Sequence, residues 1–323
     1  MKRRAFISLL GGAAAWPLAA RAQEAARNYR VGGLTPSPRD APHYVALFDE
    51  LRRLGFIEGQ NLRIDGRGYG VRNDQFVEIA VELVKTGIDA FFCAGDAATR
   101  AAQRASTTIP IIAITDDMVG SGLVRSLANP GGNTTGVSIL ATELDGKRQD
   151  ILMEAVPGLR RMAALADPSS TTAPQLQALQ EEARARGIEL SIHRIVRSEE
   201  VGPATNAAKN SGAVALNVLA SPLLYANRRI IIERAAALRL PAMYQWPEIA
   251  DEGGFLAYGP RLIQVFREMV ARQLVKVLRG AKPTDMPIEQ PTRFEFVINL
   301  RTARAIGHDV PAGLVLRADK VIE

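Results

Sequence analysis

The sequence predicts an α/β protein built from two lobes of alternating strands and helices. Short β-like runs alternate with amphipathic helical periods from Tyr29 onward. Two successive series of such units have similar length and order, and no long linker separates them. Strands flanked by helices at this spacing are typical of parallel βαβ units. Two such lobes joined by short connections form one cleft between them.

The first series begins with a strand over 29–34, followed by a helix whose apolar positions Tyr44, Leu47 and Leu51 share one face. Asn73 is expected to cap the next helix, because its side chain can accept a hydrogen bond from a free backbone N–H. We predict the remaining elements as strands at 62–64, 90–93, 109–114 and 135–139, and helices at 97–105 and near 123–127.

The second series repeats this order from about residue 142. Its last long helix has a clear apolar stripe and ends at Gly280. We predict helices at 142–155, 174–186, 199–209, 225–239, 261–279 and 302–306, and strands at 162–166, 188–195, 213–219, 242–244, 255–258 and 294–298.

The first 22 residues have the composition of an export signal. A basic start, Met1-Lys2-Arg3-Arg4, precedes a small and apolar stretch, and Ala20-Arg21-Ala22 fits the pattern that signal peptidase accepts. The segment Arg3-Arg4-Ala5-Phe6-Ile7 resembles a twin-arginine signal, with an ordinary secretory signal as the alternative. We therefore expect a mature chain that begins near Gln23 and resides in the periplasm.

Composition excludes several classes of protein. Residues 1–22 hold four basic and no acidic residues, so their removal lowers the net charge from +6 to +2. No Lys/Arg block indicates a nucleic-acid partner. Cys93 is the single cysteine and ends an apolar run, which predicts a buried thiol and no intramolecular disulfide. The three His and one Cys lack ligand spacing, so we expect no metal and no cofactor. Beyond the signal, no apolar run reaches the roughly 20 residues of a membrane span, so we expect a soluble chain.

Motifs of enzymes with layered α/β folds are also missing. The segment Gly32-Gly33-Leu34-Thr35-Pro36-Ser37 lacks the glycine spacing that a dinucleotide pyrophosphate requires. No Gly-x-Ser-x-Gly elbow occurs, and His43, His193 and His308 have no evident nucleophile partner. The sequence therefore predicts a protein that is not an enzyme.

Three segments resemble a known family. They are Asn61-Leu62-Arg63-Ile64, the run from Gly120 to Ser138 with its Pro-Gly-Gly-Asn-x-Thr-Gly motif, and Glu289-Gln290-Pro291-Thr292-Arg293-Phe294-Glu295. The chain is similar in these segments to ABC-transporter substrate-binding proteins related to the tryptophan/tyrosine-binding components. The resemblance covers essentially the whole mature chain, and the Pro-Gly-Gly-Asn-x-Thr-Gly motif is fairly specific.

The resemblance implies the periplasmic binding protein type I fold, in which two Rossmann-like lobes with parallel sheets clamp a ligand across a hinge. It implies a first lobe of residues 29–139 and 261–280 and a second lobe of residues 140–258 and 286–323. The implied function is the solute-binding component of an ABC importer, which delivers a small molecule to a membrane permease with a cytoplasmic ATPase. A periplasmic sensor for a receptor kinase or chemoreceptor is the alternative. We expect a monomer.

Candidate ligand-binding residues of the first lobe follow its strands, because ligands of open α/β sheets bind beyond the carboxyl ends of the strands. Thr35 and Ser37 follow the first strand. Asp96 and Ala97 open a helix whose free N–H groups could hold a carboxylate or phosphate, although Asp96 could simply be the helix cap. The Asp96 carboxylate would instead favour a cationic or amine-bearing ligand.

Two further candidates come from the crossover to the second lobe. Asp117 matches the place where the family carries a cleft aspartate, and an ammonium group would suit it. The pair Asp116-Asp117 could equally form a solvated turn. Ser138 lies in the strand that enters the second lobe, where its hydroxyl could bond a ligand or the hinge backbone.

Ser169, Ser221, Tyr244 and Tyr258 are the candidates of the second lobe. Amino-acid-binding members of the family tend to carry an Asp-Asn pair where Ser221-Pro222 stands here, which argues against an amino-acid ligand. Tyr244 and Tyr258 could stack on a planar or apolar ligand, and Tyr258 could instead belong to the core. Trp246 is placed at the edge of the cleft. The ligand remains open among amino acids, aromatic acids and purines.

Overall fold

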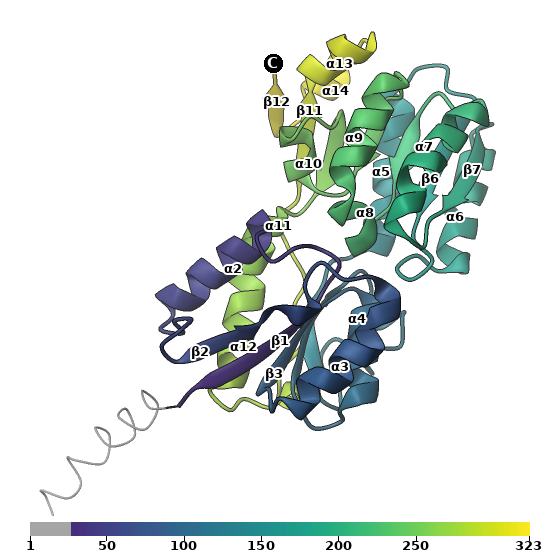
Figure 1. Ribbon diagram of the computed structural model, residues 1–323. Helices are drawn as coiled ribbons and strands as arrows, with labels where there is room; N and C mark the ends of the chain where they lie inside the picture. Colours follow the sequence, from purple (N-terminus) through teal and green to yellow (C-terminus); the bar gives the residue numbers. More distant parts are fainter. Residues whose placement is uncertain (1–26) are drawn as a thin grey trace, which may run out of the picture.

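The computed structural model describes residues 27–323, apart from the side chains of residues 141–143. The predicted export signal at 1–22 lies outside these residues. The described chain forms two lobes, each a twisted sheet covered by helices (Figure 1). The strand orders are β2-β1-β3-β4-β5 and β12-β11-β10-β9-β8-β6-β7, and every pairing is parallel except β10 with β11. The predicted α/β class with two parallel-sheet lobes is confirmed.

Helices cover both faces of the first sheet, so its central strands are buried throughout. Phe92 packs with Tyr44 of α2, whereas Phe91 and Cys93 on the opposite face pack with Leu83 of α3. Cys93 is buried, as its apolar run predicted. The elements are β1 (Tyr29–Leu34), α2 (Pro42–Arg53), β2 (Leu62–Asp65), η1 (Gly66–Gly68), η2 (Asn73–Gln75), α3 (Phe76–Lys85), β3 (Ala90–Ala94), α4 (Asp96–Ala105), β4 (Ile111–Thr115) and β5 (Thr134–Ser138).

The second lobe repeats the βα order around a wider sheet. Its elements are α5 (Ala141–Ala155), β6 (Arg161–Ala166), α6 (Ala173–Ala185), β7 (Glu189–Arg194), η3 (Ser198–Glu200), α7 (Val201–Asn210), β8 (Leu216–Val218), α8 (Pro222–Ala226), α9 (Arg228–Ala237), β9 (Ala242–Tyr244), α10 (Pro247–Asp251), β10 (Leu256–Gly259), β11 (Glu295–Asn299), α13 (Leu300–Ile306), α14 (Ala312–Val315) and β12 (Lys320–Ile322).

Two helix predictions were wrong. The segment 225–239 holds two helices, because Ser221 caps α8 and Pro222 starts it before the chain turns at Asn227 into α9. The short helix near 123–127 is replaced by turns, in which the N–H groups of Leu123 and Val124 both donate to the Met118 carbonyl. The sequence also gave no sign of α10, α14 and β12, which span only three to five residues each.

The long helix after β10 returns to the first lobe and packs against α2 and β3 (Figure 1). It consists of α11 (Leu262–Gln264), the π-helical η4 (Val265–Val270) and α12 (Ala271–Leu278), and η5 (Pro283–Asp285) follows it. The chain then runs along β5, where Glu289 exchanges backbone hydrogen bonds with Gly136 and Ser138. Residues 286–289, which the predicted boundary assigns to the second lobe, therefore lie beside the first sheet.

Within residues 27–323, three segments connect the lobes: 139–141, 259–262 and 289–295. Arg148 lies in α5, the helix that follows the first connecting segment, and pairs there with Asp145 at 2.8 Å. Its guanidinium also donates to the carbonyl of Tyr258, just before the second connecting segment, at 2.7 Å. No helix in this part of the chain is long and apolar enough to cross a bilayer.

The last glycine of the Pro-Gly-Gly-Asn-x-Thr-Gly motif permits a close backbone approach. Gly136 has φ +144°, and a Cβ at this position would lie 1.9 Å from the Ala113 carbonyl oxygen of β4. Only glycine adopts this backbone region without strain, and only glycine leaves the space. The motif thus allows β5 to pair with β4 just before the chain leaves the first lobe.

Gly136→Ala should therefore lower the free energy of unfolding by about 3 kcal/mol or more, because strain and a backbone clash add together. Urea denaturation of the mature chain measures this loss. Gly66→Ala is the matched control, since a Cβ there meets nothing within 4 Å. An equal stability of both variants would contradict the packing argument.

Candidate ligand-binding cleft

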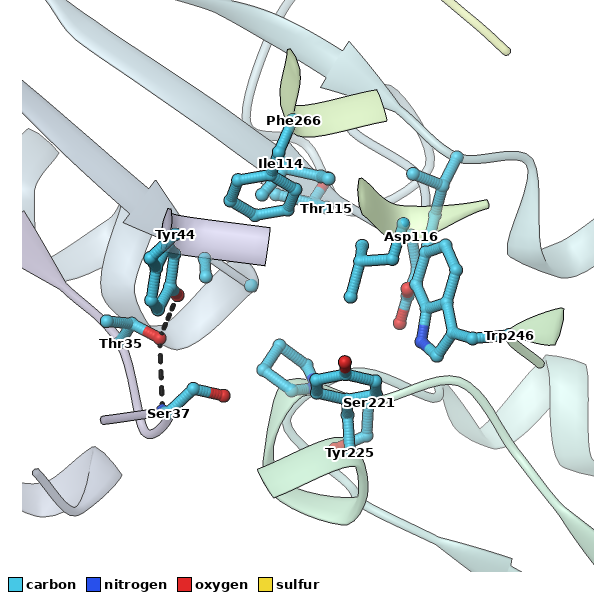
Figure 2. Close-up of a pocket in the computed structure, with 15 residues that line it drawn as sticks. Thr35, Ser37, Tyr44, Ile114, Thr115, Asp116, Ser221, Tyr225, Trp246 and Phe266 are labelled. Atoms are coloured by element: carbon cyan, nitrogen blue, oxygen red, sulfur yellow. Dashed lines mark hydrogen bonds between the residues drawn. The ribbon is translucent and has the colours of Figure 1, made fainter. Parts of the chain in front are cut away.

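A cavity lies between the lobes, where the carboxyl ends of both sheets meet (Figure 2). The first sheet and the returning helix form one wall, and α8 and the loop after β9 form the other. The lining residues are Thr35, Ser37, Tyr44, Ala94, Gly95, Ile114, Thr115, Asp116, Ile139, Ser221, Pro222, Tyr225, Trp246, Leu262 and Phe266.

Aromatic rings form much of the lining (Figure 2). Tyr44 and Phe266 of the first lobe lie 5.4 Å apart between ring centroids, and Tyr225 and Trp246 of the second lobe lie 6.4 Å apart. The ring of His43, the neighbour of Tyr44 in α2, lies 5.3 Å from the ring of Tyr225 in the other lobe, measured between ring centroids. These side chains offer a large apolar surface to a planar guest.

The loop after β1 brings two predicted residues to the cavity. Thr35 is fully buried, and its Oγ1 lies 2.5 Å from the Tyr44 hydroxyl while accepting a hydrogen bond from the Ser37 N–H at 3.2 Å. Thr35 thereby orients both the loop and the tyrosine ring. The Ser37 hydroxyl points into the cavity (Figure 2).

Asp116 follows β4 and brings a carboxylate into the lining. The residue is 8 % exposed, and no other described residue forms a hydrogen bond or ion pair with its carboxylate. Burial raises the pKa of Asp116 well above its usual range, and the charges of Asp96 and Asp145 raise it further against the opposing effect of Arg148. The adjacent Thr115 Oγ1 is also buried without a partner.

Asp96 is the first residue of α4, directly after Gly95 of the lining. It is buried, and its Oδ1 has no hydrogen-bond partner. Burial raises the pKa of Asp96 to about 6, although a hydrogen bond with Ser121 acts in the opposite direction. Ala97 is not in the lining and packs against the core cluster that contains Leu83, Phe91 and Cys93.

The two candidates near the first connection bond backbone groups. The Asp117 carboxylate accepts from the N–H groups of Val119 at 3.1 Å and Gly120 at 2.8 Å, so it holds a turn. The Ser138 hydroxyl donates to the Asp116 carbonyl at 3.5 Å and accepts from the Met118 N–H. Neither residue lines the cavity, whereas Asp116, the other member of the aspartate pair, does.

Ser221 and Ser169 share a partner in the second lobe. The Ser221 hydroxyl donates to Asp167 Oδ2 at 2.7 Å and accepts from the Leu224 N–H, which fixes it at the start of α8 and in the lining. The Ser169 N–H donates to Asp167 Oδ1, while its hydroxyl accepts from Asn73 of the first lobe at 3.3 Å. Ser169 thus forms a bridge between the lobes outside the cavity.

Tyr244 and Tyr258 do not line the cavity. Tyr244 is 1 % exposed within the apolar core, and its hydroxyl has no partner. Tyr258 is half-buried beside Phe294, with 6.3 Å between ring centroids. Their predicted stacking on a ligand stays a prediction, and the rings that line the cavity are others.

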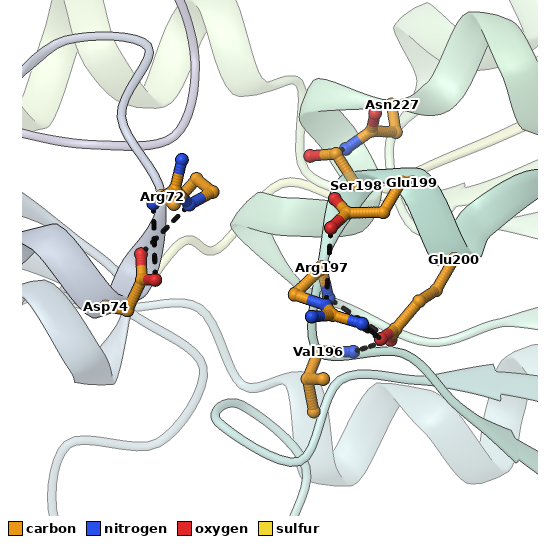
Figure 3. Close-up of polar contacts among 8 residues, drawn as sticks. All are labelled: Arg72, Asp74, Val196, Arg197, Ser198, Glu199, Glu200 and Asn227. Carbon is orange, nitrogen blue, oxygen red and sulfur yellow. Dashed lines mark hydrogen bonds and ion pairs between the residues drawn. The ribbon is translucent and has the colours of Figure 1, made fainter.

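A second hollow borders the cleft at Asn73 and Ser169 and has arginines on both sides. Each arginine is paired within its own lobe (Figure 3). Arg72 lies 3.1 Å from Asp74, and Arg197 lies 3.3 Å from Glu199 and 3.0 Å from Glu200. On each side of this hollow, the arginine is therefore paired with carboxylates of its own lobe.

The cavity thus brings together Thr35, Ser37 and Ser221 of the predicted residues. Sequence reasoning missed Tyr44 and Phe266 because each belongs to an apolar stripe that predicts a core position. The signal for Tyr225 was obscured by the prediction of one long helix over 225–239. Asp116 was visible only as the neighbour of Asp117.

Comparisons with known proteins agree with this architecture. Residues 41–322 match the family described as ABC transporter substrate binding protein. The chain belongs to this family. It is 26 % identical over 269 residues to the tyrosine-binding protein of Clostridioides difficile, a match that covers 79 % of this chain and 74 % of that protein. The family is one of substrate-binding proteins, which confirms the predictions of family and of a protein that is not an enzyme.

Solved structures show the same fold. A conserved domain protein from Vibrio cholerae superposes with a TM-score of 0.81 at 22 % identity, covering 91 % of this chain and 99 % of that one. The ABC domain in complex with L-Trp from Streptococcus pneumonia gives 0.78 at 21 % identity, covering 91 % and 100 %. A LacI family regulator from Bifidobacterium animalis gives 0.55 at 14 % identity, covering 84 % and 96 %. The fold is that of type I periplasmic binding proteins.

The buried Asp96 sets a pH dependence of stability. Its carboxyl binds a proton more tightly in the folded chain, with a pKa of about 6, than in the unfolded chain at 3.8. Ionisation therefore costs stability, a cost that is absent below pH 3.8 and complete above the folded pKa. Asp96→Asn should raise the free energy of unfolding at pH 7.5 by up to about 3 kcal/mol, and by almost nothing at pH 4.

Urea denaturation at the two pH values measures this difference. Asp40→Asn, which removes the same charge from an exposed position, is the control and should leave stability within about 0.5 kcal/mol at both. An Asp96→Asn chain no more stable than the wild type at pH 7.5 would show that the folded chain compensates the buried charge.

Proposed function

We propose that this protein is the extracytoplasmic solute-binding component of an ABC importer and holds a small organic ligand between its lobes. The observation that carries the proposal is the cavity lined by residues of both lobes. Ligand sites of open α/β lobes lie where the carboxyl ends of the strands meet, and this cavity lies there. Because one chain supplies both walls, we propose that it acts as a monomer.

The lining favours a ligand with a planar, apolar body. Tyr44, Tyr225, Trp246 and Phe266 surround the space, and few polar groups interrupt them. The tyrosine-binding relative and the relative solved with L-Trp support an aromatic ligand by analogy. Aromatic compounds are therefore the first class to test.

Ligand binding would favour a closed arrangement of the lobes through differential contacts. A guest that touches Tyr44 and Tyr225 together binds only when the lobes are near each other. The three connecting segments provide a hinge, and the Asn73–Ser169 hydrogen bond is a contact that opening would break. Closure would present one shape to a permease.

The proposal places the protein in the periplasm. The basic and apolar segment at 1–22 is the support, since it has the features of an export signal. The proposed partner is a membrane permease with a cytoplasmic ATPase, which membership of the substrate-binding family supports.

Binding should be visible through Trp246, because the other tryptophan, Trp16, precedes the predicted cleavage site. We expect an aromatic ligand to raise the melting temperature and to change Trp246 fluorescence saturably, with a Kd in the micromolar range, or about −8 kcal/mol. The measurement uses ligand-free mature chain, prepared by unfolding and refolding, and a library of aromatic amino acids, amines, aromatic acids and purines.

Trp246→Phe is the control: it should lose the fluorescence signal and keep a smaller rise in melting temperature, because Phe leaves an aromatic ring in the cavity wall. Small-angle scattering should show a smaller radius of gyration with a bound ligand. A scattering profile unchanged by a tight binder, or conversion of that binder into a product, would rule out the proposal.

A further inference from the structure

We propose that the ligand is a cation with an aromatic body and no free carboxylate, whose ammonium group is held by the Asp116 carboxylate. The inference rests on the function proposed above and specifies the class of solute. It makes aromatic amines, rather than aromatic amino acids, the preferred ligands of this cavity.

The lining carries one kind of charge. Among the described residues that form the cavity wall, Asp116 alone is ionisable at neutral pH, and no Lys, Arg or His is present. The other polar groups are hydroxyls, the indole N–H of Trp246 and backbone. A zwitterionic ligand would find a partner for its ammonium group but no cation for its carboxylate.

The Asp116 carboxylate also lacks a partner of its own. It is more than nine-tenths buried, and none of the other described residues forms a hydrogen bond or ion pair with it. A cation that comes to lie beside this carboxylate stabilises its ionised form and gains a counterion in return. An ammonium group has three donors, and the unpartnered Thr115 Oγ1 next to Asp116 offers a second acceptor.

The surroundings of Asp116 strengthen the preference for a cation. Its electrostatic neighbours are the carboxylates of Asp96, Asp145 and Asp167 and one guanidinium, that of Arg148. The Arg148 guanidinium is bonded to other groups, since it pairs with Asp145 and donates to the Tyr258 carbonyl. The excess of carboxylates repels an anionic group on a ligand.

The two helix N-termini at the cavity disfavour a ligand carboxylate. No side chain caps the N-terminus of α4 at Gly95, but the buried carboxyl of Asp96 in its first turn repels a second carboxylate. At α8, the Ser221 hydroxyl accepts from the Leu224 N–H. The arginines of the outer rim, Arg72 and Arg197, are paired with carboxylates of their own lobes (Figure 3).

The aromatic rings complete the fit. Trp246, Tyr225 and Phe266 line the same cavity as Asp116 (Figure 2). Rings placed around an ammonium binding site stabilise the cation through their negative faces and stack on an aromatic body. The cavity therefore combines one counterion with apolar walls, as an aromatic amine requires.

The test compares matched pairs of compounds that differ only by a carboxylate. Isothermal titration of the ligand-free mature chain would use tryptamine against tryptophan, tyramine against tyrosine and phenethylamine against phenylalanine. We expect the best amine to bind about tenfold or more tightly than its amino acid, because the carboxylate must be buried without a cation. Indole-3-propionate, which has the carboxylate and no amine, should not bind.

Asp116→Asn tests the counterion directly. It should weaken binding of the best amine about a hundredfold, the effect of removing one member of a buried charge pair. The exposed Asp285→Asn is the control for the loss of one negative charge and should change affinity less than about threefold at moderate salt. Melting temperature and near-UV circular dichroism report whether each variant is folded, and the wild-type pairs decide the question if Asp116→Asn is not.

The outcomes separate the inference from the proposed function. An amino acid that binds as tightly as its amine, or an Asp116→Asn chain that keeps the wild-type affinity, would overturn the inference and leave a solute-binding protein. A chain that binds none of the amines, amino acids, aromatic acids or purines would overturn both.

Discussion

Burial of both faces of each sheet is the constraint on which the rest of the structure depends. Helices cover β3 and β4 so completely that every residue of these strands is buried. Polar side chains can therefore act only where the strands end, and parallel pairing brings these ends to one edge of each sheet. The two lobes turn these edges toward each other, so Thr35, Asp116 and Ser221 meet in one cavity from distant parts of the chain.

The connections between the lobes impose a second constraint, since the chain passes between the sheets without disturbing either core. Gly136 lets β5 approach the β4 backbone, and the returning segment at 286–289 runs along β5 on the way back. Arg148 ties α5 to the end of β10 on the other side. The Arg148–Tyr258 contact is partly buried, whereas the Asn73–Ser169 bridge is exposed. The contacts of β5 and of Arg148 hold the connecting segments within each lobe.

The cleft combines a large apolar surface with few polar groups, and those groups divide into two kinds. Thr35 and Ser221 are occupied by protein partners and hold the wall in place. Thr115 Oγ1 has no such partner, and the Asp116 carboxylate forms no hydrogen bond or ion pair with another described residue; both residues belong to the cavity lining. Unsatisfied groups are expensive to bury, and these two belong to the cavity lining rather than to the interior of a lobe.

The sequence by itself determined the α/β class, the two series of βα units and the family, because periodicity and turn motifs are local properties. It also determined that loops after strands carry the site, which located Thr35, Ser37 and Ser221. Only the tertiary structure decided between Asp116 and Asp117, since a change of one residue exchanges a cavity position for a turn. The same holds for Tyr44 and Phe266, whose apolar stripes do not distinguish a ring in the core from one at a cavity wall. Whether a ring on a helix lies in the core or at the cavity wall depends on how the two lobes, which are far apart in the sequence, pack together.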